Sequence, residues 1–358
     1  MNIKTPRLSA WVTAHKKLAI VLAAVLVLGV GAGVAAGLSM LTKKEAPTPQ
    51  AVVQAPEPEP EPIKYYSPLT GALVENEAIT TQAVTAIMIE NSPDARPHSG
   101  LKNSGIVFEA IAEGGITRFL AVYQEQKPQL IGPVRSLRLY NVDWVAAFNA
   151  SVAHIGGSAA ALAEVRNGSY RDIDQFFNAG AYWRATDRYA PHNVYTSFER
   201  LDALNAAKGY TTSSFTGFVR ADSEPSATPS ATSLKVTISG PTYNSSYAYN
   251  AATNSYDRSQ GGAPHTDREE GQISPRVVIV MKVAMQTVFE DGNRQQINTI
   301  SSGPATIFQD GIVREGTWTK ASKTEQITFK DAAGETIPLA RGQTWVTAVP
   351  STTGGVTW

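Results

Sequence analysis

The 358-residue chain contains no cysteine, and its 31 basic side chains are balanced by 31 acidic ones. Without cysteine the chain cannot form a disulfide, a zinc finger, an iron–sulfur cluster or a cysteine-linked lipid anchor. A formal net charge of zero argues against non-specific nucleic-acid binding, which needs a surplus of Lys and Arg. We therefore expect no nucleic-acid partner, and any attachment to a membrane must come from the polypeptide itself.

Charged residues are also missing from one long segment, residues 18–41, LAIVLAAVLVLGVGAGVAAGLSML. As a helix rising about 1.5 Å per residue, this segment would reach roughly 36 Å and cross a hydrocarbon core of about 30 Å. The basic residues of the N-terminus, residues 1–17, favour a cytoplasmic start and export of the rest. The alternative is a cleaved signal peptide, although the apolar run is longer than an ordinary signal core. We expect a single-pass protein of the cell membrane whose folded domains lie outside the cytoplasm.

Composition divides the remaining chain. Residues 42–64 are rich in Pro and Glu and predict an extended linker, because such a segment cannot form a core. Residues 221–233, ADSEPSATPSATS, are poor in apolar side chains and indicate a second linker or a long surface loop. We therefore expect two folded domains, at residues 65–220 and 234–358.

The two expected domains differ in pattern. In the first, apolar runs typical of strands, such as residues 84–91 and 151–155, alternate with segments of helical spacing, such as the Ala-rich residues 156–166. This alternation predicts a layered α/β (or α+β) domain with a mixed sheet that is at least partly parallel. The second domain has Asp-Gly and Ala-Gly turn signals between apolar runs, which predict a smaller, mainly-β domain with hairpins.

Arginine outnumbers lysine by nine to two between positions 90 and 200. The guanidinium group binds carboxylates and phosphates in a bidentate manner, so this bias indicates that donor geometry matters. Arg118, Arg135 and Arg138 stand at expected element ends, where α/β folds bind ligands, and Ser136 is placed to cap the helix that follows. These residues predict either an anion-binding cluster or a buried network of ion pairs with nearby carboxylates.

A second candidate is the segment HIGGS, which contains His154, Gly156, Gly157 and Ser158 at a strand-to-helix junction. Two glycines let the backbone approach a ligand closely, and the start of the helix offers unpaired N–H groups. The same residues also make an ordinary turn with a helix cap. His154 is either a hydrogen-bonded core histidine or a ligand-binding group.

A third candidate is YWRATDRYAPHNVYT, in which Arg184 and Arg188 are four residues apart and His192 follows. On a helix the two arginines would share one face, whereas the alternative is aromatic packing under a loop. The five histidines of the chain lack the spacing of metal ligands. We expect no metal and no cofactor, although magnesium held by carboxylates and a substrate phosphate would leave little trace.

Eight motifs follow one another between about residues 65 and 350: SPLTG, RPHSGL, GIVFEAIAEGGITRFLAVY, IGPVRSLR, HIGGS, PHNVYT, YDRSQGGAPHTDREEGQ and GQTWVTAVP. Together they resemble the YerB-like family of predicted bacterial lipoproteins. The resemblance implies a two-part extracytoplasmic protein tied to the bacterial membrane. The lipid-bearing cysteine is missing in this chain, and the apolar residues 18–41 would replace it as the anchor.

The order of IMIEN, TRFLAVYQEQKPQLIGPVRSLR and AHIGGSAAALAEV is also similar to that of LytR-CpsA-Psr proteins, which transfer glycopolymers from polyprenyl-diphosphate carriers to peptidoglycan. This similarity implies that Arg118, Arg135 and Arg138 surround a diphosphate, although Leu139 replaces the Asp of the family's Arg-Asp pair. Three hypotheses follow: binding of an anionic envelope ligand, such as an anionic glycan or a polyprenyl diphosphate; a phosphotransferase acting on polyprenyl-diphosphate-linked glycans; or a non-enzymatic envelope assembly protein.

Overall fold

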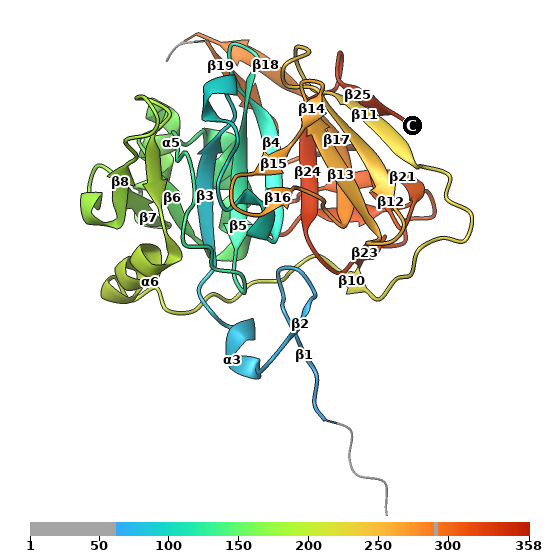
Figure 1. The fold of residues 1–358 in the computed structure, drawn as a ribbon, viewed down its shortest axis with the longest axis horizontal. Helices are drawn as coiled ribbons and strands as arrows, with labels where there is room; N and C mark the ends of the chain where they lie inside the picture. Colours follow the sequence, from blue (N-terminus) through green and yellow to red (C-terminus); the bar gives the residue numbers. More distant parts are fainter. Residues whose placement is uncertain (1–61, 290–292) are drawn as a thin grey trace, which may run out of the picture. The chain divides into compact units, whose positions relative to one another are not determined.

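One mixed sheet runs through the part of the chain that the computed structural model describes, residues 62–289 and 293–358 (Figure 1). It has twelve strands, and its main path is β22-β21-β20-β17-β24-β4-β5-β3-β6-β7, with the hairpin β18–β19 joined to β4. The strands are β3 (Thr85–Glu90), β4 (Ile106–Glu113), β5 (Ile116–Tyr123), β6 (Ser151–His154), β7 (Arg171–Asp174), β17 (Val277–Val283), β18 (Met285–Val288), β19 (Arg294–Ile297), β20 (Ser302–Gln309), β21 (Ile312–Thr319), β22 (Thr328–Lys330) and β24 (Thr344–Pro350). Both expected domains therefore contribute strands to a single sheet.

The sheet is partly parallel, as the sequence predicts. Strand β3 runs parallel to β6, β6 to β7, β17 to β24 and β24 to β4, while the remaining neighbours on the path are antiparallel. Strand β24 joins the two regions because it pairs with β17 on one side and with β4 on the other. The boundary proposed at residues 221–233 remains a prediction.

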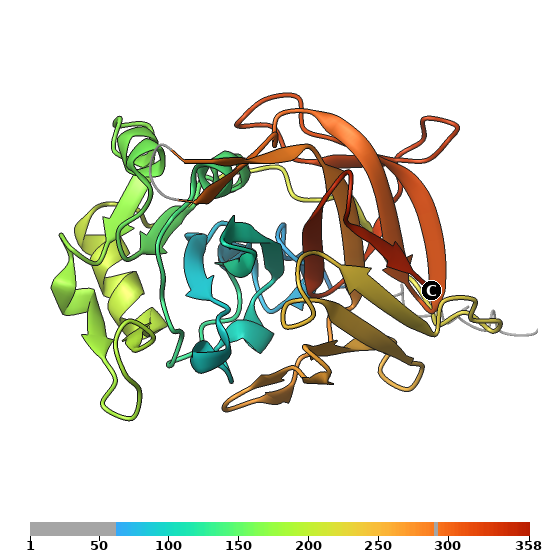
Figure 2. The same ribbon diagram turned by 90° about the horizontal axis from the view of Figure 1, so that it is seen from above.

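A second, five-stranded sheet packs against one face of the main sheet. Figure 2 shows its yellow strands beside the orange and red strands of the main sheet. Its order is β14-β13-β12-β11-β25, with strands β11 (Ser233–Thr237), β12 (Ser245–Asn250), β13 (Ser255–Gln260), β14 (Ala263–Pro264) and β25 (Gly355–Thr357). Four two-stranded sheets complete the β structure: β1 (Tyr65–Tyr66) with β2 (Leu73–Val74), β8 (Tyr182–Arg184) with β9 (Val194–Thr196), β10 (Arg220–Ala221) with β23 (Leu339–Ala340), and β15 (Thr266–Asp267) with β16 (Gly271–Gln272).

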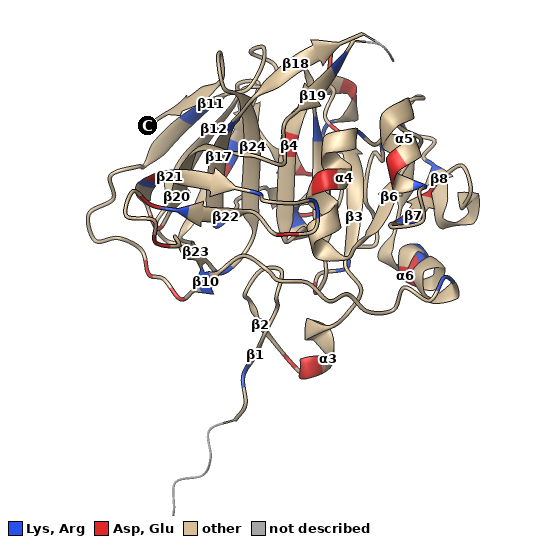
Figure 3. Ribbon diagram, turned by 180° about the vertical axis from the view of Figure 1, so that it is seen from behind, with Lys and Arg blue, Asp and Glu red and all other residues tan. Residues whose placement is uncertain are grey.

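Helices are few and short in the described residues. They are α3 (Glu77–Thr80), α4 (Leu139–Val145), α5 (Ala159–Val165) and α6 (Phe198–Ala207), and α4 and α5 lie in front of the main sheet in Figure 3. The expected helix after HIGGS is confirmed as α5. No helix of residues 62–289 and 293–358 has the length and apolar character needed to span a bilayer, and the expected span at residues 18–41 lies outside these ranges.

Three hydrophobic cores explain the apolar runs of the sequence. In β17, the alternate residues Val277, Ile279 and Met281 join the core under α4, while Val278 and Val280 face the second sheet. A strand buried on both faces reads as a continuous apolar run, as VVIVMKV does.

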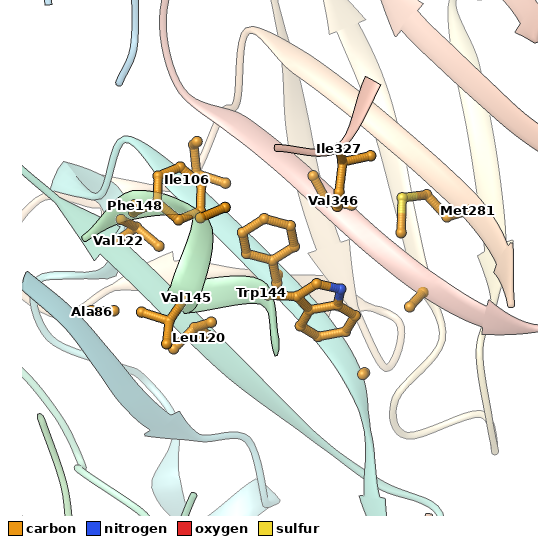
Figure 4. Packing of buried hydrophobic residues seen from close by; sticks show 14 of the residues in the cluster. Ala86, Ile106, Leu120, Val122, Trp144, Val145, Phe148, Met281, Ile327 and Val346 are labelled. Atoms are coloured by element: carbon orange, nitrogen blue, oxygen red, sulfur yellow. The ribbon is translucent and has the colours of Figure 1, made fainter. Parts of the chain in front are cut away.

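The core under α4 is built on aromatic packing. Trp144 and Phe148 belong to one buried cluster, in which Phe148 lies near Ile106 and Val122 (Figure 4), and the rings of Trp144 and Phe108 stack with centroids 5.1 Å apart. Since α4 is only seven residues long, this tertiary packing rather than helix propensity stabilises it. The packed helix holds the preceding segment, which carries the candidate arginines, against the sheet.

Candidate functional site

The segments IGPVRSLR and HIGGS lie side by side at the end of the main sheet. The N–H of Leu137 donates to the carbonyl of Gly156 at 2.9 Å, and the N–H of Ser158 donates to the carbonyl of Leu137 at 3.1 Å. The N–H of Arg135 donates to the carbonyl of Met88 in β3 at 2.8 Å. Two candidates that the sequence gives separately are thus neighbours in the fold.

A cleft of about 640 Å³ opens beside these two segments, and we call it the arginine cleft. Its described lining residues are Arg135, Ser136, Ile155, Gly156, Gly157, Leu162, Arg166, Phe176, Phe177 and Arg184. Five of the residues chosen from sequence line it: Arg135, Ser136, Gly156, Gly157 and Arg184. Three arginines and no Asp or Glu are present among these described lining residues.

Arg135 reaches the cleft from the segment before α4. Its Nε atom lies 3.3 Å from Oε1 of the buried Glu90, and a quarter of the Arg135 side chain stays exposed. His192, also chosen from sequence, lies behind it, with Nδ1 2.9 Å from Oε2 of Glu90 and 3.2 Å from Oγ of Ser92. His192 therefore contacts the partner of Arg135 rather than the cleft.

Arg166 follows the last residue of α5 and was not among the residues chosen from sequence. Its Nη2 atom lies 2.6 Å from Oδ2 of the buried Asp174, and its Nε lies 3.6 Å from Oδ2 of Asp172. The sequence signal for Arg166 is its position at the end of the helix predicted after the Gly-Gly-Ser segment. The two aspartates lie on β7, the edge strand next to β6.

His154 is a core residue and not a wall of the cleft. It is completely buried, and its Nε2 lies 2.9 Å from Oδ1 of Asp172 while its Nδ1 lies 2.8 Å from the carbonyl of Gly156. Burial raises the pKa of Asp172, but the hydrogen bond with His154 and the charge of Arg166 lower it by a larger amount. The pKa of Asp172 therefore lies below its ordinary value. This matches the hydrogen-bonded core histidine of the two alternatives.

Arg184 lies at the end of β8 and is exposed. Its Nη1 donates to Oδ1 of Asn193 at 2.8 Å, and within the described residues no carboxylate lies at ion-pair distance from it. The expectation that Arg184 and Arg188 share a helix face is wrong. Strands β8 and β9 pair antiparallel here, and Arg188 lies in the connecting loop, where it donates to the carbonyl of Pro97 at 2.6 Å. Both strands are rich in aromatic and β-branched residues, which favour strands over a helix.

Arg118 and Arg138 form a separate cluster around Glu113. Both guanidinium groups are buried, with Arg118 Nη2 2.7 Å from Glu113 Oε1 and Arg138 Nε 3.0 Å from Glu113 Oε2. Burial raises the pKa of Glu113, but the two arginines lower it by more. Burial, and then the charge of Arg118, lowers the pKa of Arg138 to about 10. The three predicted arginines therefore do not meet at one point, because Arg118 and Arg138 are held by Glu113 while Arg135 faces the arginine cleft.

Two serines differ in their capping roles. The Ser136 side chain does not cap α4, whose N-cap residue is Arg138, so that prediction is wrong; the Ser136 carbonyl instead accepts from Arg118 Nη1 at 3.0 Å. Ser158 does cap α5, with its Oγ accepting from the N–H of Ala161 at 3.4 Å. Ser158 and Arg138 also line a second cavity of about 700 Å³ between the starts of α4 and α5 and the β18–β19 hairpin.

A buried polar network brings together motifs that are far apart in sequence. The Glu109 carboxylate accepts from Arg258 Nη2 at 2.8 Å and from Trp345 Nε1 at 3.0 Å. Nδ1 of His98 lies 3.0 Å from Nε2 of His265, whose Nδ1 contacts Arg258. The sequence motifs contain these residues, but the sequence does not predict that they form one buried network. Among the described residues, no group of three His, Asp or Glu side chains is placed to hold a metal ion.

The comparison with known proteins decides the family. The family described as "Protein of unknown function (DUF3048) N-terminal domain" matches residues 69–211, and the corresponding C-terminal domain matches residues 234–346. The chain belongs to the DUF3048 family. It is 33% identical over 292 residues to "Putative lipoprotein YerB" of Bacillus subtilis (strain 168), a match that covers 80% of this chain and 87% of that protein.

The crystal structure of Bacillus subtilis YerB supports the same DUF3048 assignment. It matches with a TM-score of 0.73 and 30% identity, covering 82% of this chain and 100% of that one. The YerB-like resemblance seen in the sequence motifs is therefore confirmed. In this DUF3048 protein, the buried pair Glu109–Arg258 links the N-terminal and C-terminal regions of the family.

Proposed function

We propose that the protein binds an anionic ligand of the bacterial cell envelope in the arginine cleft. The observation that carries the proposal is that Arg135, Arg166 and Arg184 reach one cleft from three different elements, with no carboxylate among the described lining residues. Guanidinium groups bind phosphate and carboxylate oxygens with paired hydrogen bonds. Gly156 and Gly157 also line the cleft, where they contribute backbone without side chains.

Location outside the cytoplasm is part of the proposal. The relative is named "Putative lipoprotein YerB", and a lipoprotein is attached to a membrane, which supports the same location for this chain. In this chain the charge-free residues 18–41 would serve as a single-pass anchor, with the linker at residues 42–64 holding the folded part away from the bilayer.

Binding without group transfer is better supported than the phosphotransferase hypothesis. A transferase of the LytR-CpsA-Psr type would need Arg118, Arg135 and Arg138 around one diphosphate. Arg118 and Arg138 instead share Glu113, whereas Arg135 pairs with Glu90. All three arginines therefore already have an internal carboxylate partner, and Arg118 and Arg138 meet at Glu113 rather than beside Arg135, so the three do not surround one leaving group.

Residues 63–358 are suitable for testing this proposal. They form one compact unit that contains all three hydrophobic cores, and the crystallised YerB chain corresponds to most of it. Isothermal titration with diphosphate, inorganic phosphate and glucuronate should show saturable binding that weakens as salt is added. Arg184→Ala should weaken it by at least about tenfold, because a charged hydrogen bond contributes about 1.5–3 kcal/mol.

The matched control is Arg314→Ala, since Arg314 is exposed on β21, away from the cleft. It should leave binding unchanged. No saturable binding of any of the three anions, or equal losses in the two variants, would overturn the proposal.

A further inference from the structure

The arginine cleft has an apolar half that an inorganic anion would leave uncovered. Ile155 and Leu162 are half-buried in its wall, and Phe176 and Phe177 are 69% and 73% exposed. Single exposed apolar residues are common, but two adjacent phenylalanines beside a cleft are informative. Unlike Tyr and Trp, Phe has no O–H or N–H group to hydrogen-bond with water, so its ring is stabilised by contact with another apolar group.

The two phenyl rings are held in place by a hydrogen-bonded turn that begins at Asp174. The N–H of Phe177 donates to the carbonyl of Asp174 at 3.1 Å, and the N–H of Phe176 donates to Asp174 Oδ1 at 3.2 Å. Asn178 Nδ2 donates to the same carbonyl at 2.8 Å. Because Asp174 is completely buried, the turn is anchored to β7, and the exposure of the rings is a fixed feature of the fold.

The apolar and cationic halves of the cleft are continuous. The Arg166 guanidinium lies 4.9 Å from the centre of the Phe177 ring, and the Phe176 ring covers Gly156, where an added Cβ atom would come within 3.1 Å of it. A ligand whose charged group meets Arg166 would therefore have its next atoms beside the two rings. A volume of about 640 Å³ lies within the usual range for small-molecule sites.

We propose that the ligand of the arginine cleft is an amphiphile, a phosphate ester that carries an apolar chain. This inference rests on the proposed function. The phosphate oxygens meet Arg135, Arg166 and Arg184, and the chain lies along the wall formed by Phe176 and Phe177. The chain gains affinity because it removes exposed apolar surface from water.

The test compares three probes on residues 63–358: inorganic phosphate, octyl phosphate below its critical micelle concentration, and the uncharged octyl glucoside. Octyl phosphate should bind at least about tenfold more tightly than inorganic phosphate, because several methylene groups become buried. The double variant Phe176→Ala/Phe177→Ala should remove that gain and leave phosphate binding unchanged. Arg184→Ala should weaken both phosphates, and octyl glucoside should bind far more weakly than octyl phosphate.

Tyr189→Ala is the matched control, since Tyr189 is 91% exposed but does not line the cleft. Thermal unfolding of each variant confirms that it is folded. If neither phosphate binds, this inference fails, and the proposed function fails with it when diphosphate and glucuronate do not bind either. The proposal of an amphiphilic ligand is rejected, while anion binding stands, in either of two cases. The first is that inorganic phosphate binds as tightly as octyl phosphate, and the second is that the double variant still binds octyl phosphate more tightly than inorganic phosphate. Equal binding of octyl glucoside and octyl phosphate would reject the need for a charged group.

Sedimentation with phosphatidylcholine vesicles, with and without phosphatidic acid, distinguishes the source of the ester. Binding that needs phosphatidic acid and is lost in the double variant supports the proposal, with a bilayer lipid as the source. Binding of monomeric octyl phosphate without binding to vesicles also supports the proposal, with a free or carrier-bound phosphate ester as the source. Vesicle binding that persists in both the double variant and Arg184→Ala overturns the role of this cleft in recognising lipid.

Discussion

The Nη2 atom of Arg258 lies 2.8 Å from Oε2 of Glu109, and both side chains are completely buried. Arg258 comes from β13 of the second sheet and Glu109 from β4 of the main sheet, so the pair connects the two family regions through the interior. The Arg258 guanidinium also lies 4.4 Å from the centre of the Trp345 ring. The arrangement favours a structural role for the motifs that contain these residues, because no described atom of this pair reaches the surface.

Arg258→Ala should lower the free energy of unfolding of residues 63–358 by about 3–5 kcal/mol. The substitution leaves the Glu109 carboxylate buried without its ionic partner, which is more costly than losing the pair as a whole. Chemical denaturation measures the change, and the exposed Arg314→Ala should stay within about 0.5 kcal/mol of the wild type. A loss of less than about 1 kcal/mol for Arg258→Ala would contradict the structural role.

Acid should destabilise the protein through His98. Burial, and next the charge of Arg96, lowers the pKa of His98 to about 3 from its ordinary value of 6.5. Between these values the unfolded chain binds a proton that the folded chain does not, so stability falls as pH drops below about 6.5. A single such histidine gives a slope of about 1.4 kcal/mol per pH unit.

The variant His98→Gln tests this pH dependence. It should be less stable than the wild type near neutral pH, because the contact of His98 Nε2 with the carbonyl of Glu90 changes. Its stability should nevertheless fall less between about pH 7.5 and about pH 5, as measured by urea denaturation. Parallel curves for the two proteins would show that His98 is not the source.

Ser158→Ala should weaken α5, which carries Arg166 at its far end. The Ser158 hydroxyl caps the helix across a long hydrogen bond of 3.4 Å, so the loss should lie near the lower end of the usual 0.5–2 kcal/mol. Ser158→Asp should keep most of the stability, because a carboxylate is an equally good cap. If both variants lose the same free energy of unfolding, the hydroxyl is not acting as a cap.

Gly156→Ala should impair ligand binding more than its effect on stability explains. Gly156 has φ +60, and an added Cβ atom would come within 3.1 Å of Phe176 in the cleft. The control is Gly168→Ala, since Gly168 has φ +93 but open space around an added Cβ atom. Both variants should lose about 1–2 kcal/mol of stability through the left-handed backbone, but only Gly156→Ala should weaken binding of octyl phosphate. Equal binding by the two variants would show that the Gly156 backbone lies outside the site.

Local features of the fold could be predicted because short-range chemistry decides them. The Asp310-Gly311 signal gives a tight hairpin between β20 and β21, in which both residues have positive φ. The Gly-Gly-Ser segment gives a turn and a capped helix for similar reasons. The shared sheet could not be predicted, since it depends on β24 pairing with β4 across a long sequence separation. Hydrophobic patterns give the faces of a strand but not its partners.

The candidate site could be predicted only in part, because strand ends can be recognised in the sequence but ion-pair partners cannot. Gly156 and Gly157 follow β6, which lies parallel to β3, and the Arg135 N–H bonds to Met88 of β3, so the two segments meet at one end of these neighbouring strands. The separation of Arg118 and Arg138 from Arg135 depends on which carboxylate each one meets, and Glu113 and Glu90 are equally plausible partners in the sequence. Arg166 could not be predicted from the sequence, because its aspartate partners lie on β7, whose position next to β6 is a property of the folded chain.

The central claim, that the arginine cleft binds an anion, is tested most directly by nuclear magnetic resonance on isotope-labelled residues 63–358 titrated with diphosphate. The account predicts saturable shifts of the backbone amide signals of Gly156 and Gly157 and of the Nε–H signals of Arg135, Arg166 and Arg184. The Nε–H signals of the buried Arg118 and Arg258 should move little. Shifts confined to residues outside the cleft, or the absence of saturation, would contradict the claim.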